Sequence, residues 1–348
     1  MRQMFGFVFA GVVFAAMATS SAAAQTRLFS QDSELQLTID GPITALTRTA
    51  ARSTDAVPAV LTVADGAQQQ AFQIQISPRG FTRRTGGYCS FPPLRLDFDH
   101  DAVRGTLFSG QNKLKLVTRC QSDALVVLEY TVYRLYNELT PLSFRVRPAT
   151  VTYRNNSGQP HPQTQFNYLI EDVDDLAARN HLAAISVGPR EAQPSQLDSE
   201  QGAIVSLFQF MIGDLDWELV RGPEGDDCCH NGKLLAATAT ARDRLFPVPY
   251  DFDFSGFVNA PYAVPPANIR VSSVRMRYYR GYCSFNANMP AVVQRFQTHR
   301  AALYAIIDGE TRLNTARRQA AHRYLDGFFE VLDNPAAFNS QVTEHCRG

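Results

Sequence analysis

Hydrophobic and polar residues alternate along the first part of the chain in a pattern typical of short β-strands. The alternation recurs between residues 34 and 118, and glycine and aspartate separate its segments. Because successive side chains of a strand point to opposite faces, this pattern predicts strands with one buried face. We expect these strands at 35–40, 59–63, 72–76, 94–98 and 113–117.

A helical period replaces the alternation over 123–139, where the apolar residues at 125, 128, 132, 135 and 136 fall on one stripe. Two further strands are expected at 144–153 and 165–171. The first half of the chain therefore predicts a β-rich lobe that carries one helix.

The second half of the chain predicts mostly helices. Pro189–Ser199 is largely polar, holds two prolines and shows no period, which is typical of a linker. A helix is expected over 200–213, and two more at 291–308 and 311–332. The residues between them, 214–285, look irregular and include the only tryptophan. We therefore place a β-rich N-terminal lobe at 25–188 and a helical C-terminal lobe at 189–348.

The N-terminus resembles a targeting segment. Met4–Ala18 is an almost unbroken apolar run, and small residues follow it up to Ala24. Together with Arg2, this pattern predicts a secretory signal peptide at 1–24. The run is shorter than the roughly 20 apolar residues that cross a bilayer. We expect a mature protein that begins near Gln25, has no integral membrane segment, and is periplasmic or secreted.

The charge balance narrows the range of partners. The 348 residues are 45% hydrophobic and 19% charged, and 33 basic residues match 33 acidic ones. Such a chain can bury a large core but has no long-range field that would attract nucleic acid. We expect a protein or small-molecule substrate and no nucleic-acid partner.

The six cysteines of an exported chain predict up to three disulfides. One is expected between Cys89 and Cys120. Cys228 and Cys229 are expected to bond Cys283 and Cys346, because a bond between neighbouring cysteines closes a strained ring. The alternative is a zinc site at 228–230, although this segment lacks the C-x₂₋₄-C spacing of such sites.

The most informative chemistry lies in Phe246–Ala263, where Asp251 and Asp253 stand two residues apart among aromatic residues. On an extended segment both carboxylates face the same side. Two like charges in apolar surroundings are costly unless a cation lies between them. Oxygen ligands suit Mg²⁺ or Mn²⁺, so the pair predicts a metal site. The alternative is a pair of strand-end aspartates that cap the turn before Ser255.

Other polar residues could complete a site. Asp216, in the segment 213–217, is a candidate catalytic carboxylate, or part of a helix-terminal turn. His230 could orient a carboxylate and Asn231 could bind a metal, or both could belong to a turn that enters a strand. These readings stay open at the level of the sequence.

Basic residues in the first half could bind phosphates. Lys113 or Lys115, on a strand, could pair with Glu129 on the following helix, or could face water. Arg79, before Gly80, could form a phosphate-side loop or a plain turn. In order along the chain, these residues supply what phosphoryl transfer needs: a basic clamp, a carboxylate that orients the nucleophile, and metal ligands.

Several short segments resemble the spore-coat CotH-type kinase-like proteins, and they occur in that family's order. They are I-S-P-R-G-F at 76–81, L-K-L-V-T-R-C at 114–120, L-E-Y-T-V-Y-R-L-Y-N-E-L at 128–139, F-N-Y-L-I-E-D at 166–172, D-L-D-W at 214–217, H-N at 230–231 and P-Y-D-F-D at 249–253. The resemblance implies an α+β, two-lobed kinase-like fold, with the candidate metal and catalytic segment at 213–256.

The resemblance also implies roles for single residues. Asp216 would be the catalytic aspartate, Asn231 and Asp251 metal ligands, and Lys115 the lysine that binds the phosphates of ATP. Asp226 is a rival for the catalytic role, because it lies five residues before Asn231, as in the kinase catalytic loop.

We therefore expect an exported phosphotransferase that uses ATP and Mg²⁺ or Mn²⁺ on a protein or a small hydroxyl substrate. One alternative is a catalytically inactive, kinase-like binding or assembly protein of the cell envelope. Another is a metal-dependent hydrolase in which Asp251, Asp253 and His230 hold the metal.

Overall fold

The computed structural model describes residue 1 and residues 27–65, 68–156 and 162–348. The predicted signal peptide, apart from Met1, lies outside the described residues. Nearly every strand and helix expected from the sequence is present, with ends shifted by a few residues. The periodicity of the side chains therefore determines these elements locally.

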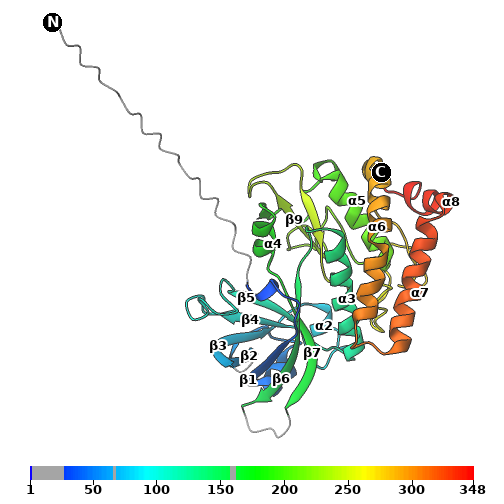
Figure 1. Ribbon diagram of the computed structural model, residues 1–348. Helices are drawn as coiled ribbons and strands as arrows, with labels where there is room; N and C mark the ends of the chain where they lie inside the picture. The colour runs from blue at the N-terminus through cyan, green and yellow to red at the C-terminus, as the bar shows by residue number, and fades with distance from the viewer. Residues whose placement is uncertain (2–26, 66–67, 157–161) are drawn as a thin grey trace.

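Strands of the first half form one closed barrel, in the order β1-β2-β3-β4-β5-β7-β6 (Figure 1). Adjacent strands are antiparallel, except that β1 runs parallel to β6. The strands are β1 (Leu35–Gly41), β2 (Val57–Asp65), β3 (Gln68–Pro78), β4 (Leu94–Phe98), β5 (Lys113–Val117), β6 (Val146–Asn155) and β7 (Gln163–Ile170).

The inside of the barrel is a hydrophobic core of its own. Its strands send alternate side chains inward, so that β4 buries Leu94 and Leu96 while Arg95 between them is exposed. Leu61 and Leu114 are also fully buried there. The alternation seen in the sequence is thus the inward and outward alternation of a closed sheet.

Helices and a small sheet form the rest of the molecule (Figure 1). The sheet has the order β10-β9-β8, and α3 packs against α6. The elements are α1 (Ile43–Thr49), α2 (Thr82–Thr85), α3 (Asp123–Leu139), α4 (Val173–Arg179), α5 (Ser199–Ile212), α6 (Met289–Gly309), α7 (Thr315–Leu332), α8 (Pro335–Phe338), β8 (Ala183–Ile185), β9 (Gly232–Ala236) and β10 (Phe246–Pro249).

The expected two-lobed kinase-like fold is wrong. The strands of the first half close into a seven-stranded barrel, and the helices that follow do not make a clear helical lobe of a kinase. The closure depends on the pairing of β1 with β6, for example Ile39 with Tyr153. Strand periodicity predicts which face of each strand is buried, but it carries no information about pairing over such a distance.

Helix α5 leads into the turn that carries Asp216. Every residue from Gln201 to Ile212 is buried, which is typical of a helix in the centre of a domain. Asp198 caps its start, because its carboxylate accepts a hydrogen bond from the amide of Gln201. Gly213 ends it in the left-handed conformation, with φ of 64°.

The three disulfides confirm the predicted cysteine bonding only in part. Cys89 bonds Cys120 as expected, but Cys228 bonds Cys229, and Cys283 bonds Cys346. The segment around Cys228 and Cys229 is held in a turn, because Cys229 and Gly232 exchange two backbone hydrogen bonds, and the amide of Cys228 donates to the carbonyl of Val187. Both cysteines are buried. Because both cysteines are in a disulfide, they cannot serve as the thiolate ligands of the alternative zinc site at 228–230.

The disulfides fit an oxidising compartment, as expected for an exported protein. None of the helices in the described part of the chain is long and apolar enough to cross a membrane. The boundary predicted between 188 and 189 stays a prediction.

Replacing Cys283 and Cys346 together by alanine should lower the free energy of unfolding by about 4 kcal/mol. Their separation of 63 residues closes a long loop in the unfolded chain. Replacing Cys228 and Cys229 together is the control and should cost much less, because the ring that this bond closes contains only these two residues. Urea unfolding measures both. Peptide mapping without reduction that joined Cys228 to Cys283 would contradict the structure.

Candidate functional site

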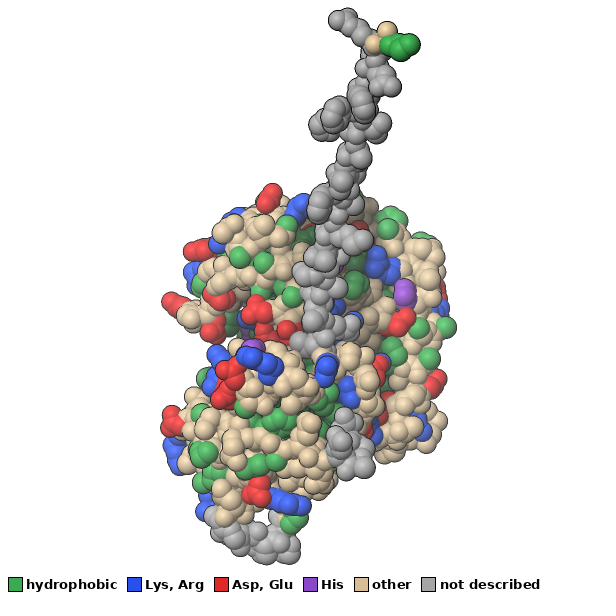
Figure 2. All heavy atoms as spheres, turned by 60° about the vertical axis from the view of Figure 1, so that its left-hand side comes forward, with side chains coloured by type: hydrophobic (Ala, Val, Ile, Leu, Met, Phe, Trp, Pro, Cys, Tyr) green, Lys and Arg blue, Asp and Glu red, His purple; other side chains and the backbone are tan. Residues whose placement is uncertain are grey.

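A cavity of about 800 Å³ lies where the barrel meets the segments that follow it. Figure 2 shows a hollow on the left-hand side of the molecule, with acidic side chains along its upper edge. The structure brings nearly all the site residues predicted from the sequence to this cavity: Arg79, Lys115, Asp216, Asp226, Asn231, Asp251 and Asp253. Glu129 does not line it, but Glu129 bonds Arg83, which does.

Three carboxylates form a cluster at the base of the cavity. One oxygen each of Glu129, Asp251 and Asp253 lies within 4.8 Å of the others. Arg83 compensates two of them, with its Nη2 2.5 Å from Glu129 Oε2 and its Nε 2.9 Å from Asp253 Oδ2. The hydroxyl of Tyr262 also donates to Asp253.

The pairing expected between Lys115 and Glu129 is replaced by the pair of Arg83 with Glu129. Burial disfavours the charged guanidinium, but Asp253 and Glu129 outweigh it and raise the pKa of Arg83. Burial raises the pKa of Glu129 to about 7. Sequence reasoning missed Arg83, because no motif marks it and both of its partners are distant in the chain.

Asp251 is the member of the cluster that remains available for a ligand. Its backbone amide donates to the hydroxyl of Tyr133, but its carboxylate has no hydrogen bond or ion pair with the described residues. Burial, and then the charge of Asp253, raise the pKa of Asp251. The charges of Arg83 and Arg79 act in the opposite direction and lower this pKa.

Asn231 lies close to Asp251, because the amide of Tyr250 donates to the carbonyl of Asn231. Both residues have positive φ angles, 50° for Asn231 and 64° for Asp251. Residues other than glycine adopt this conformation at a cost of about 1–2 kcal/mol. Strained backbone of this kind gathers at functional sites, where the surrounding structure holds it in place.

Asp216 lies on the turn after α5, where two side chains hold its carboxylate. Nε2 of His230 lies 2.8 Å from Oδ1 of Asp216, and Nδ2 of Asn231 donates to Oδ2 over 3.1 Å. The hydrogen bond with Asp216 raises the pKa of His230. Asp216 is half-buried, so one side of its carboxylate group is open to the cavity.

Asp214 stabilises this turn by accepting two hydrogen bonds. Its Oδ1 accepts a hydrogen bond from the amide of Asp216, and its carbonyl accepts one from the indole of Trp217. Its Oδ2 is buried without a partner among the described residues. Burial, and then the charge of Asp216, raise the pKa of Asp214 to about 8. The sequence shows the motif around Asp214 but not its burial, so this residue was missed.

Three basic side chains, those of Arg79, Lys115 and Lys233, line the cavity without a carboxylate partner among the described residues. Lys115 approaches the rings of Tyr250 and Phe144, with its Nζ 5.4 Å and 5.9 Å from their centroids. Burial and the nearby charge of Arg79 lower the pKa of Lys115 to about 8. Arg79 makes only a backbone hydrogen bond, to Pro93. Lys113, the alternative to Lys115, lies on the same face of β5 but is exposed and does not line the cavity.

Asp226 lies at the rim of the cavity, on an exposed loop. Glu224 and Asp227 lie on the same loop and also line the cavity, and Cys229 forms part of the wall behind them. The carboxylate of Asp226 has no hydrogen bond to any described residue, whereas that of Asp216 is held by His230 and Asn231. This difference favours Asp216 for a role that needs a fixed carboxylate.

No family model matches this chain, and a search of curated proteins found no match. The resemblance to the CotH-type proteins therefore stays a prediction.

Replacing Asp214 by asparagine should stabilise the protein increasingly as the pH rises. The pKa of Asp214 is about 8 in the folded protein and about 4 in the unfolded chain. Between these two pH values, the folded wild type keeps a proton that the unfolded chain releases. Wild-type stability therefore falls between about pH 4 and pH 8, and the loss is complete above that range. Asparagine mimics the protonated acid and avoids this loss.

Melting temperatures of the two proteins, measured at intervals from pH 5 to pH 9, test this expectation. The difference between Asp214→Asn and wild type should grow up to about pH 8 and then level off. A difference that stays constant over the whole range would show that Asp214 is not protonated in the folded protein.

Proposed function

We propose that this protein is a phosphotransferase that binds a nucleotide with Mg²⁺ or Mn²⁺ in the cavity of about 800 Å³. The observation that carries the proposal is the arrangement of charges there. Three cations without carboxylate partners among the described residues, Lys115, Arg79 and Lys233, share one cavity with the carboxylates of Asp216, Asp251 and Asp253. Its volume lies in the range of small-molecule sites.

Lys115 and Arg79 would bind the phosphates. A phosphate group compensates both cations, and it favours the charged form of Lys115, whose pKa of about 8 is lowered by burial. Arginine can also bind a phosphate through two parallel hydrogen bonds. ATP is the nucleotide that the resemblance implies.

Asp251 and Asn231 would hold the metal, with Asp253 beside them. The carboxylate of Asp251 is free of other partners, and the Oδ1 atom of Asn231 remains available because its Nδ2 atom donates to Asp216. A bound metal would neutralise phosphate charge. The two residues already lie close together, since the amide of Tyr250, next to Asp251, donates to the carbonyl of Asn231.

Asp216 would orient the hydroxyl that accepts the phosphoryl group. Its two oxygens are held by His230 and Asn231, and each keeps a lone pair for a further hydrogen bond. A carboxylate that is fixed in this way can accept the proton of a hydroxyl on a protein or a small molecule. Export to the periplasm or the cell exterior, and the kinship with CotH-type proteins, are parts of the same proposal.

A second candidate function is an inactive binding protein with the same cavity. Arg83 favours it, because this arginine already compensates Glu129 and Asp253 and so occupies part of the acidic cluster. A protein of this kind would bind an anionic ligand or a partner without transferring phosphate.

Replacing Asp251 by alanine should weaken Mn²⁺-dependent nucleotide binding by more than about 100-fold, because it removes a charged metal ligand. Calorimetric titration with ATP and Mn²⁺ measures the affinity, and an unchanged circular dichroism spectrum shows that the fold is intact. Wild type that bound no nucleotide under these conditions would exclude the phosphotransferase.

Replacing Asp216 by alanine should spare nucleotide binding and lower phosphoryl transfer by about 10²- to 10⁴-fold. Transfer of labelled phosphate to the protein itself or to casein measures the rate. Asp226→Ala is the matched control and should keep its activity. If Asp226→Ala is inactive and Asp216→Ala is active, Asp226 is the catalytic carboxylate. Nucleotide binding without any transfer by wild type would favour the binding protein.

A further inference from the structure

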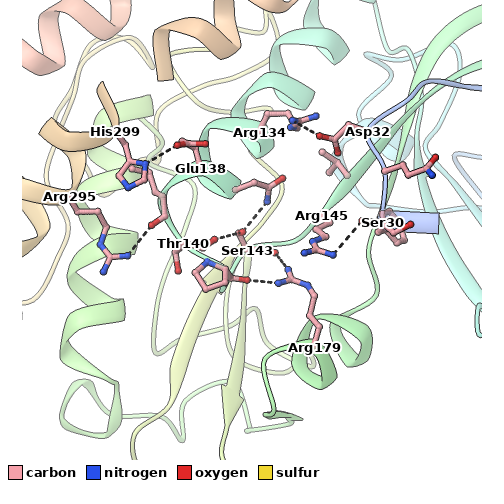
Figure 3. A pocket seen from close by; sticks show the side chains of 16 residues that line it. Ser30, Asp32, Arg134, Glu138, Thr140, Ser143, Arg145, Arg179, Arg295 and His299 are labelled. Atoms are coloured by element: carbon pink, nitrogen blue, oxygen red, sulfur yellow. Dashed lines mark hydrogen bonds and ion pairs between the residues drawn. The ribbon is translucent and has the colours of Figure 1, made fainter. Parts of the chain in front are cut away.

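A second cavity, of about 670 Å³, lies on another part of the molecule. It is lined by the segment 29–32, the end of α3 and the turn after it, the start of β6, one residue of α4 and two residues of α6 (Figure 3). None of its lining residues lines the first cavity. The two cavities can therefore bind different ligands.

Most basic groups of this second cavity have an acidic partner. Arg134 pairs with Asp32 over 2.8 Å, and Arg295 pairs with Glu200 over 3.1 Å. His299 lies 2.8 Å from Glu138. Figure 3 shows the pair of Arg134 with Asp32 and the pair of His299 with Glu138. Glu200, the partner of Arg295, does not line the cavity.

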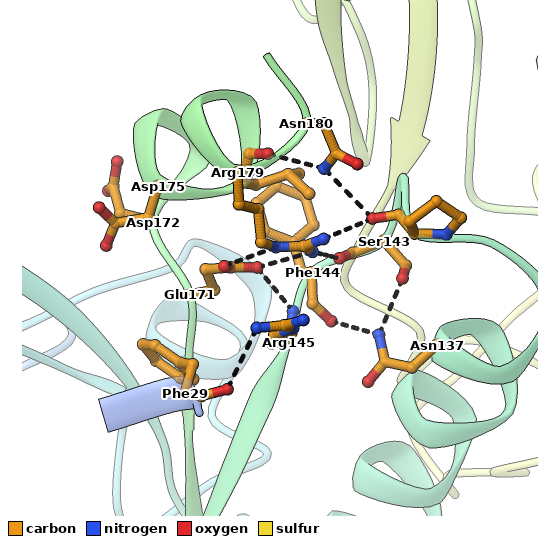
Figure 4. Close-up of polar contacts among 12 residues, drawn as sticks. Phe29, Asn137, Ser143, Phe144, Arg145, Glu171, Asp172, Asp175, Arg179 and Asn180 are labelled. Atoms are coloured by element: carbon orange, nitrogen blue, oxygen red, sulfur yellow. Dashed lines mark hydrogen bonds and ion pairs between the residues drawn. The ribbon is translucent and has the colours of Figure 1, made fainter. Parts of the chain in front are cut away.

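Arg179 is a structural residue, and each of its three guanidinium nitrogens donates at least one hydrogen bond. It bonds both oxygens of Glu171, at 2.9 Å and 3.0 Å, and also the carbonyls of Pro141 and Ser143. Glu171 accepts one further bond, from the backbone amide of Arg145. Figure 4 shows Glu171 between Arg179 and Arg145. The carboxylate of Glu171 is thus committed to groups other than the guanidinium of Arg145.

Arg145 is the arginine of this cavity that lacks an ionic partner among the described residues. Its guanidinium has one contact, 3.5 Å from the carbonyl of Phe29, which is at the outer limit of a hydrogen bond. The side chain is half-buried, and burial together with the charge of Arg179 lowers the pKa of Arg145. A cation that has lost part of its water and has no partner favours an anion beside it.

We propose that the second cavity binds a small anion that carries a carboxylate or phosphate group, held by the guanidinium of Arg145. The planar guanidinium matches both groups, because it can donate two parallel hydrogen bonds to them. Arg134 can add a second contact, since its partner Asp32 is 67% exposed and such exposed pairs are weak. The volume of the cavity suits a small molecule.

Calorimetric titration with inorganic phosphate and, separately, with citrate tests the proposal and distinguishes the two anionic groups. We expect wild type to bind at least one of them. Arg145→Gln should lower that affinity at least about tenfold, because it removes the charge-assisted bonds. Arg52→Gln, which removes the same charge from an exposed position, should leave the affinity unchanged.

Lys115→Gln separates this site from the first cavity. Affinity that survives Lys115→Gln and is lost in Arg145→Gln supports the second site, whether or not the protein transfers phosphate. Loss in Lys115→Gln with no effect of Arg145→Gln places the anion in the first cavity and overturns the proposal, as does wild type that binds neither anion. Arg145→Lys keeps the positive charge but cannot donate two parallel hydrogen bonds to one anion. It serves as the test variant if Arg145→Gln does not fold.

Discussion

The ion pairs of Arg83 hold together three segments that are distant in the sequence. Arg83 itself belongs to α2, Glu129 to α3, and Asp253 to the segment after β10. Without the guanidinium, three carboxylates with oxygens within 4.8 Å of one another would be left in a largely buried place. Removing one partner of a buried ion pair costs about 3–5 kcal/mol, so this arginine determines how the barrel meets the rest of the molecule.

Covalent bonds support the same arrangement. The Cys89–Cys120 disulfide joins the loop after α2 to the segment just before α3, the two elements that supply Arg83 and Glu129. The Cys228–Cys229 disulfide lies next to His230 and Asn231, which hold Asp216. Cys89–Cys120 thus joins two distant segments beside the first cavity, whereas Cys228–Cys229 joins adjacent residues.

The two cavities differ in how their charges are balanced. In the first, cations without partners and a carboxylate without partners lie side by side, which suits a ligand that brings both phosphate and a divalent metal. In the second, the ion pairs leave a single guanidinium, that of Arg145, without a carboxylate. A small anion without a metal would be enough to balance this charge. Charge balance within each cavity, and not its size, separates the two proposals.

The sequence by itself determined most strands and helices, because side-chain periodicity acts within one element, as in β4 and α5. It also indicated the carboxylates, the amide and the lysine that line the first cavity. Only the tertiary structure decided the closure of the barrel, the bond between Cys228 and Cys229, and the pairing of Glu129 with Arg83 in place of Lys115. These depend on which distant residues meet and on how deeply they are buried, and a local pattern of residues contains neither.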